Sequence, residues 1–169
     1  MYFSPISIND VIYHPRLTLF INGILAWGNS GAGHMNRILK LQKKVLRIIN
    51  NVDFREHSNP LFYHCNTLKV NDIYSLQLGS FMHQLNTQSL PKSICLMFTK
   101  NYNIHHYFTR QCNEFHKSHS RTTTYKATIK HEGPRLWNSL NFNLQNICSL
   151  SLFKRKYKNM MLDNYLHND

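Results

Sequence analysis

Acidic residues are scarce in this chain. Its 169 residues include 8 Asp and Glu against 20 Lys and Arg, which gives a formal net charge of +12 at pH 7. A two-metal phosphoryl-transfer site needs several carboxylates that converge on the ions, whereas the carboxylates here are scattered from Asp10 to Asp169. The excess of cations favours an anionic partner, above all nucleic acid. The composition is typical of a binding protein more than of an enzyme.

Sequence motifs for catalysis and for cofactor binding are also absent. No G-x-S-x-G elbow, H-E-x-x-H helix or Rossmann fingerprint occurs. Gly28, Gly31 and Gly33 are followed by no Walker pattern, so we interpret them as a turn between helices. Cys112 and His116 lie close together in a polar stretch, where such proximity is too common to indicate a hydrolase. We therefore expect no catalytic residue, no cofactor and no enzymatic activity of the chain itself.

The cysteines form no C-x-x-C pair, and long apolar runs are missing. Leu17–Trp27, the one segment that suggests a signal or a membrane span, has 11 residues, too few to cross a bilayer, and lacks the features of a secretory signal.

Cys112, His116 and His119 supply only part of a zinc site, so histidines of a surface loop are favoured over a bound metal. We expect a reduced nuclear or cytoplasmic setting, without secretion or a membrane partner.

The strongest structural signal is a helix that begins near Met35 and ends near Asn50, with Asn29 or Ser30 expected to cap its start. Its apolar residues recur at the spacing of one helix face: Met35, Ile38, Leu39, Val45, Leu46 and Ile49. The other face carries cations at the same spacing: Arg37, Lys40, Lys43, Lys44 and Arg47. This pattern predicts a helix whose apolar side joins the core and whose basic side faces water or an anionic partner.

The remaining patterns predict a mainly α fold, with a single helical domain over residues 17–169 after a poorly organised segment, 1–16. Caps, prolines and apolar spacing indicate further helices at residues 60–64, 71–86, 92–98, 135–140 and 152–165. Residues 121–130, RTTTYKATIK, are β-branched and alternate in polarity, which predicts one short β-strand or hairpin. Glu132-Gly133-Pro134 is expected to separate this strand from the next helix.

The last predicted helix repeats the arrangement of the first, because it carries several cations beside an apolar side. Two basic helices and a basic strand in one small domain favour nucleic acid over a merely solvated surface. The candidate RNA- or DNA-binding residues are Arg37, Lys40, Lys43, Lys44, Arg47, Arg121, Lys126, Lys154, Arg155 and Lys158. Tyr102, Tyr107 and Phe108 are a further candidate surface on which single-stranded bases could stack.

Several blocks of sequence carry a resemblance to a known family. In chain order they are GILAWGNS, LQKKVLRII, FREHSNPLF, LKVNDIYSLQ, LPKSICLMF, SRTTTY, GPRLWNSL and SLSLFKRKYKNMML. Together they resemble the C-terminal region of non-LTR retrotransposon reverse transcriptases of the jockey-like kind. The resemblance runs from about Leu19 to Tyr165, and residues 1–16 match poorly.

This resemblance implies a parent protein that is an RNA-directed DNA polymerase. The family's polymerase aspartates and its endonuclease domain lie upstream of the matching blocks, so no catalytic residue carries over to this chain. The resemblance implies a truncated, non-catalytic accessory segment that contacts RNA or DNA non-specifically and adjoins the upstream polymerase domain. The alternative is an inactive structural remnant that packed on the polymerase thumb, and such a remnant would expose apolar surface.

Overall fold

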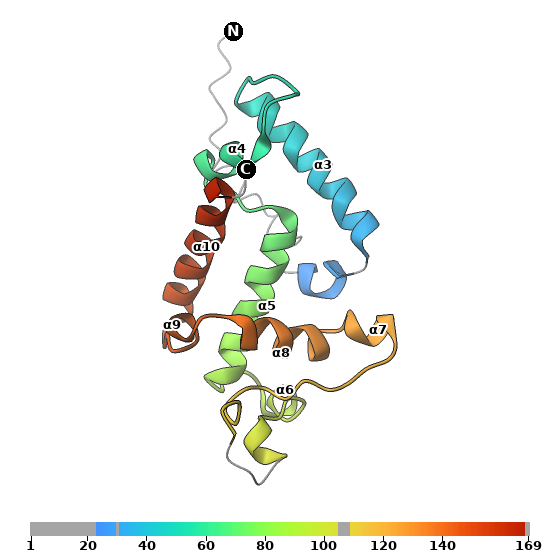
Figure 1. The fold of residues 1–169 in the computed structure, drawn as a ribbon, viewed down its shortest axis with the longest axis vertical. Coiled ribbons are helices and arrows are strands. Elements are labelled where there is room, and N and C mark those ends of the chain that lie inside the picture. The colour runs from blue at the N-terminus through green and yellow to red at the C-terminus, as the bar shows by residue number, and fades with distance from the viewer. Residues whose placement is uncertain (1–22, 30, 105–108, 168–169) are drawn as a thin grey trace. The chain divides into compact units, whose positions relative to one another are not determined.

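A computed structural model describes residues 23–29, 31–104 and 109–167 (Figure 1). The expected segment 1–16 lies outside the described residues. So do the proposed cap at Ser30 and two of the three aromatic residues of the candidate stacking surface.

The fold is mainly helical over the described residues, as the sequence predicts. The chain divides into two compact units, Met1–Gln77 with Met160–Asp169 and Leu78–Asn159. No helix in the described part of the chain is long and apolar enough to cross a membrane. Each unit has a core of its own.

The first unit is built around α3. After a helical stretch at residues 23–27, its elements are α3 (Ala32–Ile49), α4 (Ser58–His64), the beginning of α5 (Val70–Asn86) and the end of α10 (Leu150–His167). The helix α3 ends where the sequence predicts, with Asn50 as its C-cap. It begins at Ala32, three residues before Met35. Gly31 precedes it with a φ of 135°, a backbone conformation that residues other than glycine rarely adopt, and so sets this start.

The core of the first unit joins α3 to the chain that enters α5. Ile24, Met35 and Val70 are buried together. Partly buried side chains pack around them: Trp27, Ile38, Leu39, Ile73 and Tyr74. The side chain of Gln42 adds two polar contacts, since its Nε2 donates to the Leu68 carbonyl at 2.7 Å and its Oε1 accepts from the Val70 N–H at 3.0 Å. These bonds hold α3 against residues 68–70.

The second unit consists of shorter helices around the rest of α5. They are α6 (Lys92–Cys95), the 3₁₀ turn η1 (Asn101–Asn103), α7 (Thr123–Lys126), α8 (Ile129–Ser139), α9 (Phe142–Gln145) and the beginning of α10. Its core contains a buried histidine, His83, whose ring lies 4.9 Å from that of Phe153 and 6.2 Å from that of Trp137. His83 Nε2 lies 2.6 Å from the carbonyl oxygen of Ile147, so one of its two buried ring nitrogens has a partner, while Nδ1 has no hydrogen-bond partner among the described residues.

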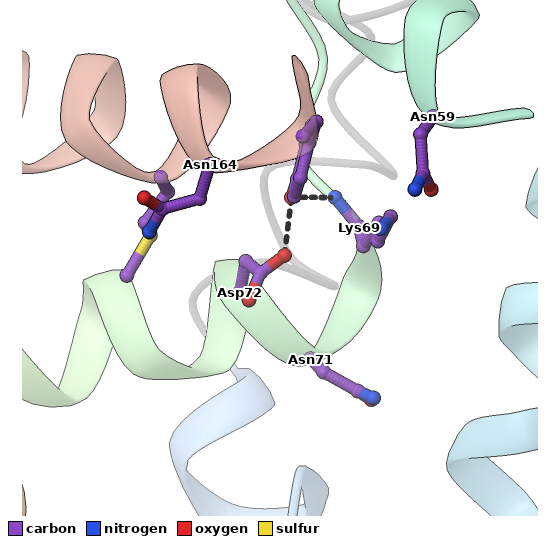
Figure 2. Close-up of a pocket in the computed structure, with 7 residues that line it drawn as sticks. Asn59, Lys69, Asn71, Asp72 and Asn164 are labelled. Atoms are coloured by element: carbon purple, nitrogen blue, oxygen red, sulfur yellow. Dashed lines mark hydrogen bonds between the residues drawn. The ribbon is translucent and has the colours of Figure 1, made fainter. Parts of the chain in front are cut away.

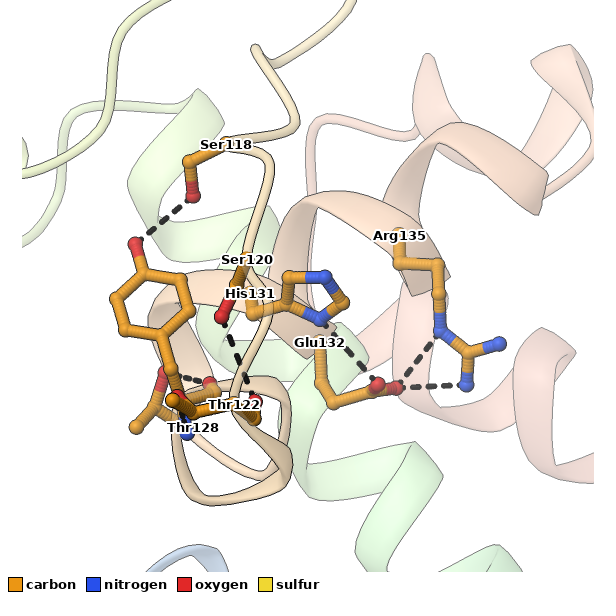
Figure 3. A network of polar contacts seen from close by, with 8 residues as sticks. Ser118, Ser120, Thr122, Thr128, His131, Glu132 and Arg135 are labelled. Carbon is orange, nitrogen blue, oxygen red and sulfur yellow. Dashed lines mark hydrogen bonds and ion pairs between the residues drawn. The ribbon is translucent and has the colours of Figure 1, made fainter.

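The predicted β-strand at residues 121–130 is wrong. Thr123–Lys126 form the short helix α7, and the Thr122 side chain caps it by accepting from the Tyr125 N–H (Figure 3). The Thr128 hydroxyl then donates to the Tyr125 carbonyl at 2.7 Å and closes the turn. β-branched residues favour a strand only where a neighbouring strand is present to pair with, and the described residues contain no strand pair beyond one isolated bridge, Lys100 with Phe115.

The predicted break at residues 132–134 is also wrong, because α8 begins at Ile129 and runs through Pro134. Proline inside a helix removes one backbone hydrogen bond, but here Gly133 and Pro134 are both buried. A Cβ atom at Gly133 would lie 2.7 Å from Met82 Sδ. The glycine thus permits α8 to approach α5 closely, and the burial gained offsets the lost bond.

We predict that replacing Gly79 of α5 by alanine destabilises the second unit, although alanine is the better helix former. The new Cβ atom would lie 2.9 Å from the ring of Tyr157, which is buried against Phe153. Overpacking of this kind costs about 1–3 kcal/mol. Urea denaturation followed by circular dichroism measures the loss. Gln84→Ala on the same helix is the matched control and should change stability by less than about 0.5 kcal/mol, so equal effects of the two variants would contradict the prediction.

Candidate nucleic-acid interface

The cations of α3 lie opposite the side that the core buries. Met35 and Leu46 are 6% and 5% exposed. Arg37, Lys40 and Lys44 are exposed on the other side, and we call these three residues the basic row. They follow one another at i, i+3 and i+7, the spacing of a single line along a helix. The predicted basic side of this helix is thus on the surface of the first unit.

Two further cations of α3 are only partly exposed. Lys43 is half-buried, and Arg47 is held by the loop that follows the helix. Arg47 donates to the carbonyl oxygen of Glu56 from Nε at 3.2 Å and from Nη2 at 2.9 Å. This guanidinium therefore stabilises the loop in addition to adding charge. Lys43 adjoins Gln42 and so lies near residues 68–70.

No carboxylate in the described part of the chain pairs with the basic row. Among the described residues, the one Lys or Arg within 4.0 Å of a carboxylate is Arg135, which pairs with Glu132 at 2.7 Å (Figure 3). That pair lies on α8 in the second unit. The electrostatic field of the basic row is therefore not cancelled by a neighbouring carboxylate of the described residues, and it attracts anions from solution to the surface.

The apolar stripe of α3 is narrower than the sequence predicts. Val45 and Ile49 were expected in the core, but they are 51% and 47% exposed. Leu41 and Ile48 are 64% and 68% exposed. Leu41, Val45 and Ile48 follow one another at i, i+4 and i+7, and we call them the apolar row. Gln42 occupies a position on the buried side of α3. The core of this small unit therefore covers only part of the helix surface that carries apolar side chains.

The other candidate cations belong to the second unit. Arg121, Lys126 and Arg155 are exposed, with Lys126 at the end of α7 and not on a strand. Lys154 and Lys158 are half-buried, and burial lowers the pKa of Lys158. Desolvation disfavours the ammonium form, so burial makes Lys158 a poorer phosphate contact than a fully exposed lysine would be. The predicted set is thus divided, five residues in each unit.

The Cys112–His119 cluster, interpreted above as part of a surface loop, and the candidate stacking residues lie outside the basic row. Within the described residues no group of three or more His, Cys, Asp or Glu side chains is close enough to hold a metal ion. Cys112 is buried, His116 half-buried and His119 exposed. Of the candidate stacking residues, Tyr102 is the one that the structure describes, and its side chain is 54% exposed.

Sequence reasoning missed a pocket of about 320 Å³ in the first unit (Figure 2). Residues from α4, α5 and α10 line it together with the residue before α5: Asn59, Lys69, Asn71, Asp72, Met161, Asn164 and Tyr165. The Tyr165 hydroxyl donates to the Asp72 carboxylate and accepts from the Lys69 backbone N–H at 3.1 Å. Tyr165 and Asp72 are 93 residues apart, so no local spacing could indicate that they meet.

Lys69 is held in place beside this pocket by aromatic rings. Its Nζ lies 4.2 Å from the ring centroid of Tyr165 and 5.9 Å from that of Phe62, a cation–π arrangement. Burial lowers the pKa of Lys69, the Asp72 carboxylate raises it, and the Lys43 ammonium lowers it further. Burial, together with the hydrogen bond to Asp72, raises the pKa of the Tyr165 hydroxyl far above its ordinary value.

Comparison with known proteins identifies no relative: no protein-family model, no curated protein and no solved structure matches the chain. Its function is therefore inferred from the residues and from their geometry.

We predict that Tyr165→Phe lowers the free energy of unfolding by about 1–3 kcal/mol near neutral pH, because it leaves two half-buried partners, the Asp72 carboxylate and the Lys69 N–H, without this hydrogen bond. The folded-state pKa of Tyr165 is raised above the ordinary value of 10.0. The stabilisation is therefore fully present below pH 10.0. It is lost as the pH rises above this value, because the tyrosine hydroxyl then ionises in the unfolded chain but not in the folded one, which lowers the free energy of the unfolded chain.

Urea denaturation of both proteins across this pH range tests the prediction. The difference between wild type and Tyr165→Phe should be constant below pH 10.0 and should shrink above it. Tyr63→Phe, at an exposed tyrosine of the same unit, is the control and should leave the curve unchanged. A difference that grows above this pH would show that the hydroxyl is not held as described.

Proposed function

We propose that this chain binds RNA or DNA without sequence specificity through the basic row of α3, and that it catalyses no reaction. The observation that carries the proposal is that Arg37, Lys40 and Lys44 are exposed in a line and pair with no described carboxylate. Phosphates of a nucleic-acid backbone are a regularly spaced array of anions, so a line of cations matches them. The net charge of +12 adds long-range attraction.

The resemblance of the sequence to a retroelement protein agrees with this proposal. On that resemblance the chain is a C-terminal fragment of a non-LTR retrotransposon reverse transcriptase, placed after the polymerase domain. A role beside the polymerase requires contact with template RNA or target DNA, and such contact needs no base specificity. The partners that we propose are thus RNA or DNA and the upstream polymerase domain, in a nuclear or cytoplasmic setting.

We predict that Arg37→Gln, Lys40→Gln and Lys44→Gln together weaken binding and flatten its dependence on salt. Each lost phosphate contact reduces the slope of log K against log salt by about 0.9 for duplex DNA and about 0.7 for single strands. Fluorescence anisotropy with a labelled oligonucleotide, repeated across a salt titration, measures the slope. The fold should persist, since the three residues lie off the buried side of α3.

A charge-matched control separates this surface from a general effect of net charge. Lys92→Gln, Lys117→Gln and Lys130→Gln remove the same number of charges from exposed positions in the second unit. That variant should keep the wild-type slope. If both triple variants reduced the slope equally, binding would depend on net charge alone and not on the basic row.

The apolar row of α3 favours the second candidate function, that of a structural segment docked on the upstream polymerase thumb. Leu41, Val45 and Ile48 form an exposed apolar line along the helix. Exposed apolar patches mark protein contacts, or cause association when the partner is missing. In this view the row is the face that the upstream domain covers in the parent protein.

We predict that the isolated chain self-associates with rising concentration and that Leu41→Gln, Val45→Gln and Ile48→Gln together abolish the association. Size-exclusion chromatography with light scattering gives the mass across a concentration series. Leu96→Gln, at an 82% exposed residue of the second unit, is the control and should leave the association unchanged. A wild-type chain that stays monomeric at all concentrations would argue against the docking role.

A further inference from the structure

The pocket beside α5 is electrically balanced, unlike the surface around it. Three carboxamides line it, those of Asn59, Asn71 and Asn164, together with one ammonium and one carboxylate, those of Lys69 and Asp72 (Figure 2). A carboxamide carries both a donor and an acceptor. The pocket thus offers hydrogen bonds of both kinds with no net charge, in a chain whose net charge is +12.

The pocket also adjoins α3 at Gln42 and Lys43. Gln42 bonds to the backbone on both sides of Lys69, to the Leu68 carbonyl and to the Val70 N–H. Lys43 follows Gln42 on α3, and its charge acts on the Lys69 ammonium. All of these residues belong to the first unit. A ligand in the pocket is therefore next to the helix that carries the basic row.

An isolated phosphate group does not suit this pocket. The Asp72 carboxylate would repel it, and the Lys69 ammonium lies over the ring of Tyr165 at 4.2 Å instead of projecting freely. Phosphates have better sites on the exposed cations of α3. The better ligand is a neutral, flat group that both donates and accepts hydrogen bonds along an edge, and a nucleobase is such a group.

The size of the pocket agrees with such a ligand. Its volume of about 320 Å³ falls at the lower end of the range of about 300–1,000 Å³ that is typical of small-molecule sites. A base can enter only when it is unstacked and unpaired, because a base within a duplex presents just its groove edges. The pocket therefore favours a single strand.

We propose that this pocket takes one nucleobase of a single-stranded RNA or DNA whose phosphates lie along the basic row of α3. The proposal rests on the nucleic-acid binding proposed above and adds a base-dependent contact to a charge-dependent one. The Asp72 carboxylate accepts from an N–H group of the base, and the carboxamides and Lys69 provide the remaining donors and acceptors. The phosphate contacts position the strand on the protein, and the contacts in the pocket make the affinity depend on the presence of a base.

Two probes test this: a labelled single-stranded DNA of mixed sequence, and an abasic strand with the same number of phosphates. Anisotropy titrations should show that wild type binds the base-containing strand about tenfold more tightly, a difference that corresponds to about 1.4 kcal/mol. Asn71→Ala with Asn164→Ala should remove most of that difference and leave the salt slope unchanged. The control, Asn113→Ala with Asn159→Ala, changes two exposed asparagines of the second unit and should behave as wild type.

The outcomes separate the two proposals. Equal, salt-dependent affinity of wild type for both strands would overturn the base pocket and leave phosphate binding intact. A base preference that survives in Asn71→Ala with Asn164→Ala would also overturn the pocket. Absence of salt-dependent binding to either strand would overturn the proposed function, and the pocket with it.

Discussion

The side chain of Gln42 is the interaction on which the first unit depends. Its two hydrogen bonds, to the Leu68 carbonyl and to the Val70 N–H, fasten the middle of α3 to the chain that enters α5. One of them satisfies the Val70 N–H in the first turn of α5, where N–H groups have no partner within the helix. They also fix the rotation of α3 about its axis, so that one side faces the core and the basic row faces outward. Leucine at this position would fill the apolar stripe but would leave both backbone groups unpaired, at a cost of about 1–3 kcal/mol each if they remain buried.

The scarcity of carboxylates gives the few that remain separate roles. Glu132 pairs with Arg135 on the surface of α8, and such exposed pairs contribute little to stability. Asp72 instead accepts from the buried hydroxyl of Tyr165 and raises the pKa of Lys69 against the effect of burial. One carboxylate thus links the end of α10 to the start of α5 and balances the charge of the pocket. The cations of α3 have no such partner among the described residues, so their charge is available to a ligand.

Local pattern predicted α3 well and the pocket not at all, and the difference has a physical cause. A helix repeats its buried positions every three or four residues, so its existence and its charged side can be inferred from a short stretch. The neighbouring elements decide which of the apolar side chains of a helix are covered. Val45 and Ile49 are therefore exposed although they fit the apolar spacing of α3. For residues 121–130, the Thr122 cap outweighed β propensity because none of the described residues forms a strand alongside. The pocket joins Asn59, Asp72 and Tyr165, whose proximity follows from tertiary packing alone.

The basic row and the apolar row are neighbours on α3, and this bears on the two candidate functions. Leu41 follows Lys40 by one residue and Arg37 by four, and Ile48 follows Lys44 by four, so the rows run side by side along the helix. A nucleic-acid backbone contacts cations without covering a parallel apolar line, because phosphates recruit charge and gain nothing from leucine or isoleucine. A protein partner gains from the apolar line and not from unpaired cations. On these two proposals, α3 has room for a nucleic acid and a protein at once. A protein that covers the apolar row would exclude water there, and the lower local dielectric would strengthen the adjacent attraction between cations and phosphates.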